Sequence, residues 1–408
     1  MQIEHLPKVE VGSCNTPLQL LPHLTGDLGK NKLYIKRDDL TGLALGGNKT
    51  RKLDYLVAYA LENGYTTLMT FGGVQTNHGR LTVAAAVKYG LKSILVLKGA
   101  KPDYLSGNLL LDRLMDTELV FVDTTAYDHL PPAERAAKAQ AYLEECTRKI
   151  VAEKEAQGEK VLNIPVGGQG VIGAAGYIQA VPEIMRQMEE QGIQAKHLVV
   201  GYGSTGTFAG LWAGAKYYNA PFQVVGIPIE PDYRSREETA DFLNQISETY
   251  QMGFTCAPED LDLELGPPEA PYGGAGYNLP DRETWETIAY LARTEGVFLD
   301  PCYTGKSFRG FVDLVRRGSS AWKAAPSSWI PAAPPGFGAG SSWTLPRICS
   351  GRTAGTSPFS KPNNRRALQG GRRKKFPPAS FFIPRKPHAK RVVTGGSDSV
   401  DMKKEASF

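Results

Sequence analysis

Residues 197–230 read HLVVGYGSTGTFAGLWAGAKYYNAPFQVVGIPIE, and their order of apolar runs and turns decides the fold. A β-type run over 197–202 leads into a turn of Gly, Ser and Thr, a helical stretch continues to Tyr218, and residues 222–230 form a second apolar run. The same order occurs upstream, with a strand at 67–71, a helix at 77–89 and a strand at 93–97. Repeated strand–helix–strand units predict parallel sheets covered by helices, with ligands at the carboxyl ends of the strands.

The turn inside this first stretch, Gly201-Tyr-Gly-Ser-Thr-Gly-Thr207, is a candidate anion site. It satisfies the GxGxxG pattern, and Glu230 ends the next strand, so a dinucleotide-binding unit is one interpretation. The hydroxyls of the turn favour a second interpretation, a compact cup for a terminal phosphate monoester. A plain structural turn is the third, and the turn alone leaves all three open.

A second turn, Gly46-Gly-Asn-Lys-Thr-Arg-Lys-Leu53, precedes an amphipathic helix. Asn48 is the expected N-cap and Lys49 lies in the first helical turn, where the helix dipole and burial both lower the pKa of a lysine. A neutral amine is what Schiff-base chemistry requires. The alternative is that three basic residues at a helix start are simply solvated.

A third turn, Gly72-Gly-Val-Gln-Thr-Asn-His-Gly-Arg80, follows a strand and opens a helix. The hydroxyl of Thr76 and the backbone amides at the helix start are suited to holding a carboxylate. Asn77 offers both a donor and an acceptor to a ligand oxygen. An ordinary capped turn with a structural His78 is the competing interpretation.

Composition divides the chain near residue 318. Residues 1–318 carry 31 basic and 39 acidic side chains, whereas residues 319–408 carry 16 basic and 3 acidic ones and 11 of the 28 prolines. The first part is long enough for two lobes, and we expect the basic tail to be disordered. No apolar run is long enough to span a membrane. The cysteines show no metal-binding spacing and argue against a disulfide framework, so we expect no metal and a cytoplasmic location: Cys14, Cys146, Cys256, Cys302 and Cys349.

Together with Leu33-Tyr-Ile-Lys-Arg-Asp-Asp-Leu-Thr41, the three turns resemble the D-cysteine desulfhydrase and 1-aminocyclopropane-1-carboxylate (ACC) deaminase family over about residues 8–318. This resemblance implies a pyridoxal 5′-phosphate (PLP) enzyme of fold type II, which is an α/β, tryptophan-synthase-β-like fold with two lobes of three-layer open parallel sheets. It implies a large PLP-binding domain from residues 1–50 and 161–318, incomplete at its C-terminal end. Residues 51–160 would form a small α/β domain, and a homodimer is expected.

The resemblance also implies roles for single residues. Lys49 resembles the cofactor lysine, and Asn77 the partner of the pyridine 3′-oxygen. Thr76 and the Asn77 and His78 amides resemble the substrate-carboxylate site. Tyr277 and Tyr303 resemble the two active-site tyrosines, and whether Lys49 or a tyrosine is the general base stays open. The turn that resembles the phosphate cup consists of Gly203, Ser204, Thr205, Gly206 and Thr207.

Thr304 favours one branch of this family. The ACC deaminases follow the second tyrosine with Glu, whose carboxylate keeps the pyridine nitrogen protonated, whereas this chain and the desulfhydrase branch have Thr there. We therefore expect α,β-elimination of D-cysteine, or of a related β-substituted amino acid such as cysteate, to pyruvate, ammonia and sulfide. ACC deamination to 2-oxobutyrate is the alternative. From other classes of protein, a nicotinamide (NAD) oxidoreductase and a non-catalytic amino-acid-binding protein stay open.

The resemblance stops near Gly318, and the genetic code explains why. The family continues with an apolar strand and a loop resembling Thr-Gly-Gly-Ala-Pro-Gly, and GC-rich codons for that loop, shifted by one base, encode Pro331-Ala-Ala-Pro334. We therefore expect residues 319–408 to be an out-of-frame translation, whether in the gene or in its sequencing, and this form to be impaired. A genuine basic extension, with Gly371-Arg-Arg-Lys-Lys375 facing nucleic acid or an acidic surface, is the competing interpretation, and we expect no specific nucleic-acid partner.

Overall fold

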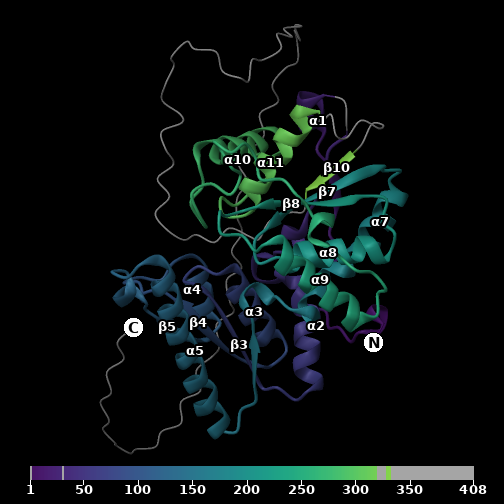
Figure 1. The fold of residues 1–408 in the computed structure, drawn as a ribbon. Helices are drawn as coiled ribbons and strands as arrows, with labels where there is room; N and C mark the ends of the chain where they lie inside the picture. Colours follow the sequence, from purple (N-terminus) through teal and green to yellow (C-terminus); the bar gives the residue numbers. More distant parts are fainter. Residues whose placement is uncertain (1, 30–31, 319–327, 332–408) are drawn as a thin grey trace, which may run out of the picture. The chain divides into compact units, whose positions relative to one another are not determined.

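The computed structural model describes residues 2–29, 32–318 and 328–331, all within one compact unit, Met1–Thr344. Two parallel four-stranded sheets form its framework (Figure 1). The first has the strand order β5-β4-β3-β6. Its strands and their associated helices are β3 (Thr67–Gly73), β4 (Lys92–Lys98), β5 (Glu118–Val122), β6 (Val161–Ile164), α3 (Asn77–Lys88), α4 (Gly107–Leu114) and α5 (Pro132–Ala156).

Both faces of the first sheet are covered because successive strand residues point to opposite sides. On one face Leu68 packs against apolar residues of α2 (Lys49–Glu62) and α3. On the other face Met69 lies with Ile94 and with the inner side of α5. The sheet is therefore the middle of three layers.

The second sheet has the order β10-β7-β8-β9 and is also parallel. Leu198 faces the core shared with α6, α7, α8 and α9, whereas the neighbouring Val199 faces the core shared with α1, α10 and α11. The elements of this part are β7 (Ala195–Tyr202), β8 (Gln223–Pro228), β9 (Asp262–Leu263), β10 (Ser328–Pro331), α6 (Val171–Ile178), α7 (Ala180–Glu190), α8 (Gly206–Tyr217), α9 (Arg236–Tyr250), α10 (Arg282–Glu295) and α11 (Thr304–Arg317).

The N-terminal segment adds a small antiparallel pair, β1 (Leu18–Leu20) with β2 (Tyr34–Lys36), and the helix α1 (Pro22–Leu28) between them. Short 3₁₀ turns complete the described chain at Ile3–His5, Asp38–Thr41, Leu43–Leu45, Thr125–Tyr127, Val166–Gly168 and Pro258–Asp260. The predicted three-layer parallel α/β architecture is confirmed. Among the described residues, no helix is long and apolar enough to cross a membrane.

Two details differ from what the sequence led us to expect. Strand β6 pairs with β3, so the first sheet extends to Ile164, past the domain boundary expected near residue 160. Strand β10 lies beside β7 at the edge of the second sheet (Figure 1). Trp329 and Ile330 are paired with His197 and Leu198. Four residues of the tail that was expected to be disordered, Ser328–Pro331, thus form a strand at this edge of β7, because a ladder is made by backbone groups that almost any sequence supplies. The other residues of the expected tail, 319–327 and 332–408, lie outside the described residues.

Candidate active site

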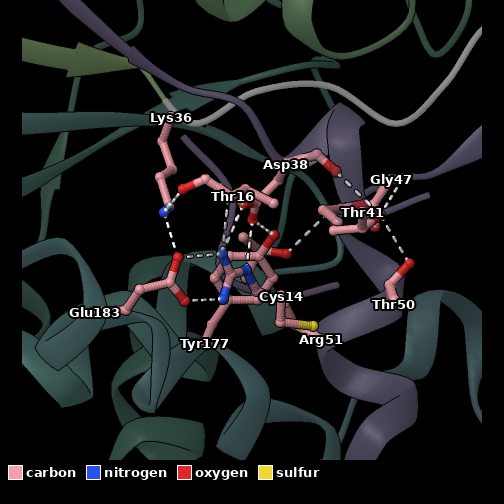
Figure 2. A network of polar contacts seen from close by, with 12 residues as sticks. Cys14, Thr16, Lys36, Asp38, Thr41, Gly47, Thr50, Arg51, Tyr177 and Glu183 are labelled. Atoms are coloured by element: carbon pink, nitrogen blue, oxygen red, sulfur yellow. Dashed lines mark hydrogen bonds and ion pairs between the residues drawn. The ribbon is translucent and has the colours of Figure 1, made fainter. Parts of the chain in front are cut away.

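Lys49 begins α2, and a buried polar network holds the first turn of this helix in place (Figure 2). The guanidinium of Arg51 donates to both carboxylate oxygens of Asp38 at 2.8 Å, and Tyr177 donates to the same carboxylate at 2.7 Å. Although burial alone would raise it, the pKa of Asp38 is lowered to about 2, chiefly by Arg51. Glu183 accepts from Arg51 at 2.7 Å and also pairs with Lys36. These buried charges are thus all paired, as burial requires.

The loop before Lys49 has an unusual backbone that the sequence pattern could not specify in detail. Positive φ angles run through Ala44, Leu45, Gly46 and Gly47. A Cβ at Gly46 would clash with the carbonyl oxygen of Asp39, so only glycine fits there. The Thr41 hydroxyl accepts from the Gly47 amide at 2.8 Å and lies 3.1 Å from the Thr50 hydroxyl, which ties the loop to the helix (Figure 2).

The Lys49 amine lies among other predicted site residues. Its Nζ donates to Asn48 Oδ1 at 3.1 Å and lies 5.9 Å from the centre of the Tyr303 ring. Burial lowers the pKa of Lys49 to about 8, against an opposing effect of Asp300. Asn48 precedes the helix as expected, but its side chain makes no capping bond and instead donates to Thr207 Oγ1 at 3.2 Å. Asn48 thereby links Lys49 to the Gly/Ser/Thr turn.

The turn over Gly203, Ser204, Thr205, Gly206 and Thr207 ends β7 and opens α8, so its backbone amides converge at a helix N-terminus. Lys52 lies at the same turn, because a Cβ at Gly206 would come within 2.9 Å of its Nζ. This amine is fully buried, and among the described residues its hydrogen-bond partner is a single carbonyl, Gly167 O at 3.1 Å. Burial, with Lys49 adding to it, lowers the pKa of Lys52 well below its usual value.

A buried amine with one carbonyl partner, set against a turn of amides and hydroxyls, fits an anion such as a phosphate group. The residues of this turn therefore suit the phosphate of PLP. Sequence reasoning missed Lys52 by reading it as part of a basic cluster. The spacing of the two lysines could have predicted this, because residues three apart lie on the same face of a helix and a buried Lys49 places Lys52 on the buried face as well.

Two glycines of the 3₁₀ turn Val166–Gly168 form the surface against which these groups meet, and sequence reasoning missed them as well. A Cβ at Gly167 would lie 3.0 Å from Ser204 Oγ and 3.6 Å from Lys49 Cε. A Cβ at Gly168 would lie 3.3 Å from His78 Cε1. The turns carrying Lys49, Ser204 and His78 therefore converge on this one segment, although they are far apart in sequence.

The expected carboxylate turn caps α3. The Thr76 hydroxyl accepts from the Gly79 amide at 3.1 Å, which leaves its own hydrogen free to donate. Asn77 Oδ1 accepts from Asn108 at 2.9 Å and from Arg80 at 3.3 Å. Burial lowers the pKa of His78 well below its usual value, with Lys49 and Lys52 adding to the effect, so its imidazole is neutral.

The two tyrosines come together as a pair. Their hydroxyl oxygens are 2.7 Å apart and their rings meet edge to face, with centres 5.5 Å apart. Burial raises the pKa of Tyr277 to about 12 and that of Tyr303 well above its usual value. Both phenols are therefore protonated at neutral pH and can act as proton donors near Lys49.

Thr304 has a partner that the sequence did not suggest. Its hydroxyl donates to Asp300 Oδ2 at 2.6 Å, and it accepts from the Asp300 amide at 3.0 Å. The same carboxylate also accepts from the amides of Cys302 and Tyr303, at 2.9 and 2.7 Å, just before α11. A fully buried carboxylate thus lies directly behind the Thr304 hydroxyl.

Comparison with known proteins agrees with this geometry. Residues 9–323 match the family described as pyridoxal-phosphate dependent enzymes. The chain belongs to this family, and its cofactor is accordingly PLP and not a dinucleotide. Among the described residues, no group of three or more His, Cys, Asp or Glu side chains could hold a metal ion.

Within this family, the chain is similar to proteins named D-cysteine desulfhydrase and ACC deaminase. The chain is 36% identical to the D-cysteine desulfhydrase of Salmonella typhi over 323 residues, which are 77% of this chain and 91% of that one. It is 35% identical to a putative ACC deaminase of Pyrococcus abyssi over 317 residues, 78% of this chain and 89% of that one. A crystal structure of an ACC deaminase homologue matches with a TM-score of 0.67 at 34% identity, covering 82% of this chain and 93% of that one.

Proposed function

We propose that this protein catalyses the α,β-elimination of D-cysteine, or of a related amino acid with a good β-leaving group. With water consumed, the products are pyruvate, ammonia and sulfide. The observation that carries the proposal is the set of protonation states around Lys49. Lys49, whose pKa is lowered to about 8, lies 5.9 Å from the ring of Tyr303, and Tyr303 is hydrogen-bonded to Tyr277. Both tyrosines stay protonated, so one base and two acids are linked in one site.

PLP held in this site would withdraw electrons from the amino acid, whose amino group would take the place of the Lys49 amine, and so make its Cα–H bond acidic. The chain's own groups supply the rest of the chemistry. The Thr76 hydroxyl and the amides that open α3 would hold the substrate carboxylate. Lys49 Nζ would take the Cα proton, since it is the one group of the three that is partly neutral near pH 8. Tyr303 Oη, hydrogen-bonded to Tyr277, would give a proton to the departing sulfur.

Thr304 supports elimination over the opening of a cyclopropane ring. Its hydroxyl hydrogen is given to Asp300, so its oxygen can only accept a hydrogen bond from a protonated pyridine nitrogen. The Asp300 carboxylate would be separated from the cofactor by the Thr304 hydroxyl, whereas the family's Glu would reach it directly, so the cofactor would be a weaker electron sink. Such a sink suffices when sulfide leaves. Sequence identity does not separate the two reactions, because relatives of both names lie between 35% and 38%.

The proposal is tested by loading the protein with PLP and assaying it side by side with D-cysteine and ACC. We expect a visible absorption band that borohydride traps on Lys49, and faster release of pyruvate than of 2-oxobutyrate. Lys49→Ala should lose the band and at least about a thousandfold in rate, as expected for loss of the lysine that carries the cofactor.

Faster release of 2-oxobutyrate from ACC would overturn the choice of substrate. A spectral change on adding amino acid without any keto-acid product would indicate a sensor. A borohydride-trapped label on another lysine would show that Lys49 is not the residue that carries the cofactor.

A homodimer and a cytoplasmic location are also proposed here. The dimer rests on the family resemblance. The location rests on the sequence, and the four described cysteines, which are free thiols, suit a reducing compartment: Cys14, Cys146, Cys256 and Cys302. Light scattering of the PLP-loaded protein would measure its mass in solution directly.

A further inference from the structure

Arg80 is the starting point of a chain of hydrogen bonds whose direction is determined. Its side chain is fully buried, and its guanidinium donates to Gly46 O at 2.9 Å, in the loop before Lys49. It also donates to Asn108 Oδ1 at 2.8 Å. An arginine can only donate, so the atom of Asn108 that faces it must be the amide oxygen.

The orientation of Asn108 determines what lies on its other side. With its oxygen at Arg80, its Nδ2 donates to the carbonyl of Gln75 and to Asn77 Oδ1, both at 2.9 Å. Its backbone amide donates to Gln75 Oε1 at 2.8 Å, and the residue is 1% exposed. Turned over, Asn108 would place its NH2 against a guanidinium and its oxygen against a carbonyl, so only one orientation is favourable.

Asn77 is then restricted as well. Its Oδ1 accepts from two donors, Asn108 Nδ2 and Arg80 Nη1, so its Nδ2 must point the other way. We propose that Asn108 and Arg80 are positioning residues that make Asn77 a donor-only contact, specific for an acceptor oxygen of the bound ligand. The inference rests on the proposed function, in which the ring oxygen of PLP is that acceptor.

The physical consequence is a preference for the ionised ring oxygen. A fixed N–H aimed at an oxygen favours the form with the negative charge, and the low dielectric of the site strengthens the effect. A freely rotating asparagine would show no such preference, because its oxygen and nitrogen could exchange places. The network thus selects a ligand that carries an oxyanion at this position.

Reversal of the amide tests the inference. In Asn108→Asp the new carboxylate still accepts from Arg80, but it now faces Asn77 with an acceptor, so the Asn77 amide should turn over and present its oxygen to the ligand. Two probes are titrated against each variant, PLP and its analogue lacking the ring oxygen. We expect Asn108→Asp to bind PLP roughly 10- to 100-fold more weakly than the wild type does, as for an unmade buried hydrogen bond. The variant and the wild type should bind the analogue with nearly the same affinity.

Spectroscopy provides a second readout, because the long-wavelength band of the bound cofactor reports an ionised ring oxygen and the short-wavelength band a protonated one. The ratio should move toward the short-wavelength band in Asn108→Asp. Gln75→Glu is the matched control, since it adds the same charge next to Asn108 but leaves the Asn108–Asn77 bond intact, and its ratio should stay near that of the wild type.

Equal weakening of both probes in Asn108→Asp, or the same spectral change in Gln75→Glu, would overturn the inference. Absence of PLP binding by the wild type would instead refute the proposed function.

Discussion

At the residue scale, the site is built from ionisable groups whose pKa values are shifted, although the Tyr277 side chain is half exposed. Burial lowers the pKa of Lys49 to about 8 and raises that of Tyr277 to about 12. The surroundings therefore move the pKa values of the base and the acid further apart than their chemistry alone would. Lys52 responds to burial in the same direction as Lys49. A site that must release and return protons near neutral pH requires such shifts.

Asp112 is a buried carboxyl group outside the site, and its burial makes the stability of the protein depend on pH. It is fully buried in α4, and its carboxylate oxygens have no hydrogen-bond partner among the described residues. Burial raises the pKa of Asp112 to about 7, with Arg80 opposing. The native state therefore keeps a proton that the unfolded chain releases near pH 4, and stability falls as the pH rises from about 4 to about 7.

We predict that Asp112→Asn, which mimics the protonated form, is as stable as the wild type at pH 4 and more stable at pH 8 by roughly 1–3 kcal/mol. Urea unfolding at a series of pH values measures the difference. Asp116→Asn is the control, because it makes the same chemical change at an exposed residue just beyond the same helix. A less stable Asp112→Asn at pH 8 would mean that the carboxylate is ionised and paired.

At the element scale, α11 determines where the tyrosines lie. Tyr303 precedes the helix, and the fully buried Lys306 lies one turn further along. Its Nζ donates to three carbonyl oxygens at 2.7 Å, those of Ile229, Gly273 and Gly276. The last two belong to the loop that leads into Tyr277. One ammonium with all three hydrogens used thus joins the end of β8, this loop and α11.

We predict that Lys306→Met releases the loop, because three buried carbonyls lose their donor. Chymotrypsin should cleave after Tyr277 at least about tenfold faster, and the free energy of unfolding should fall by about 3 kcal/mol. Lys36→Met is the matched control, since Lys36 is equally buried and donates to Thr16 O and Gln187 Oε1 away from this loop. Equal cleavage in both variants would show general destabilisation and contradict the prediction.

At the scale of the whole molecule, the site depends on the order of the strands. The carboxyl ends of β3 and β7 carry the Thr76 and Ser204 turns, and α11 brings Tyr303 from the far end of the family match. Strand β10 completes the edge of the second sheet through a short ladder that ends at Pro331, which has no N–H to donate.

We predict that restoring the reading frame after Gly318 raises the stability of the protein and its affinity for PLP. An apolar strand with every backbone donor would then replace Ser328–Pro331 beside β7. The restored chain should unfold at a higher urea concentration and bind PLP more tightly than the 408-residue chain. Resequencing the DNA around codon 318 shows whether a base was gained or lost. If the 408-residue chain turned over D-cysteine as fast as the restored one, the lost segment would not be needed to complete the site.

The sequence by itself determined the parallel α/β class, the Lys49 turn and the Gly/Ser/Thr turn, because apolar periodicity and turn chemistry are local properties of a chain. Only the tertiary structure decided which lysines are buried, that Asn77 Oδ1 accepts from Asn108, and that Asp300 holds the Thr304 hydroxyl. Lys52 meets Gly167 across 115 residues, and Lys306 meets Ile229 across 77. Burial and hydrogen-bond direction depend on such distant partners, and no local pattern specifies them.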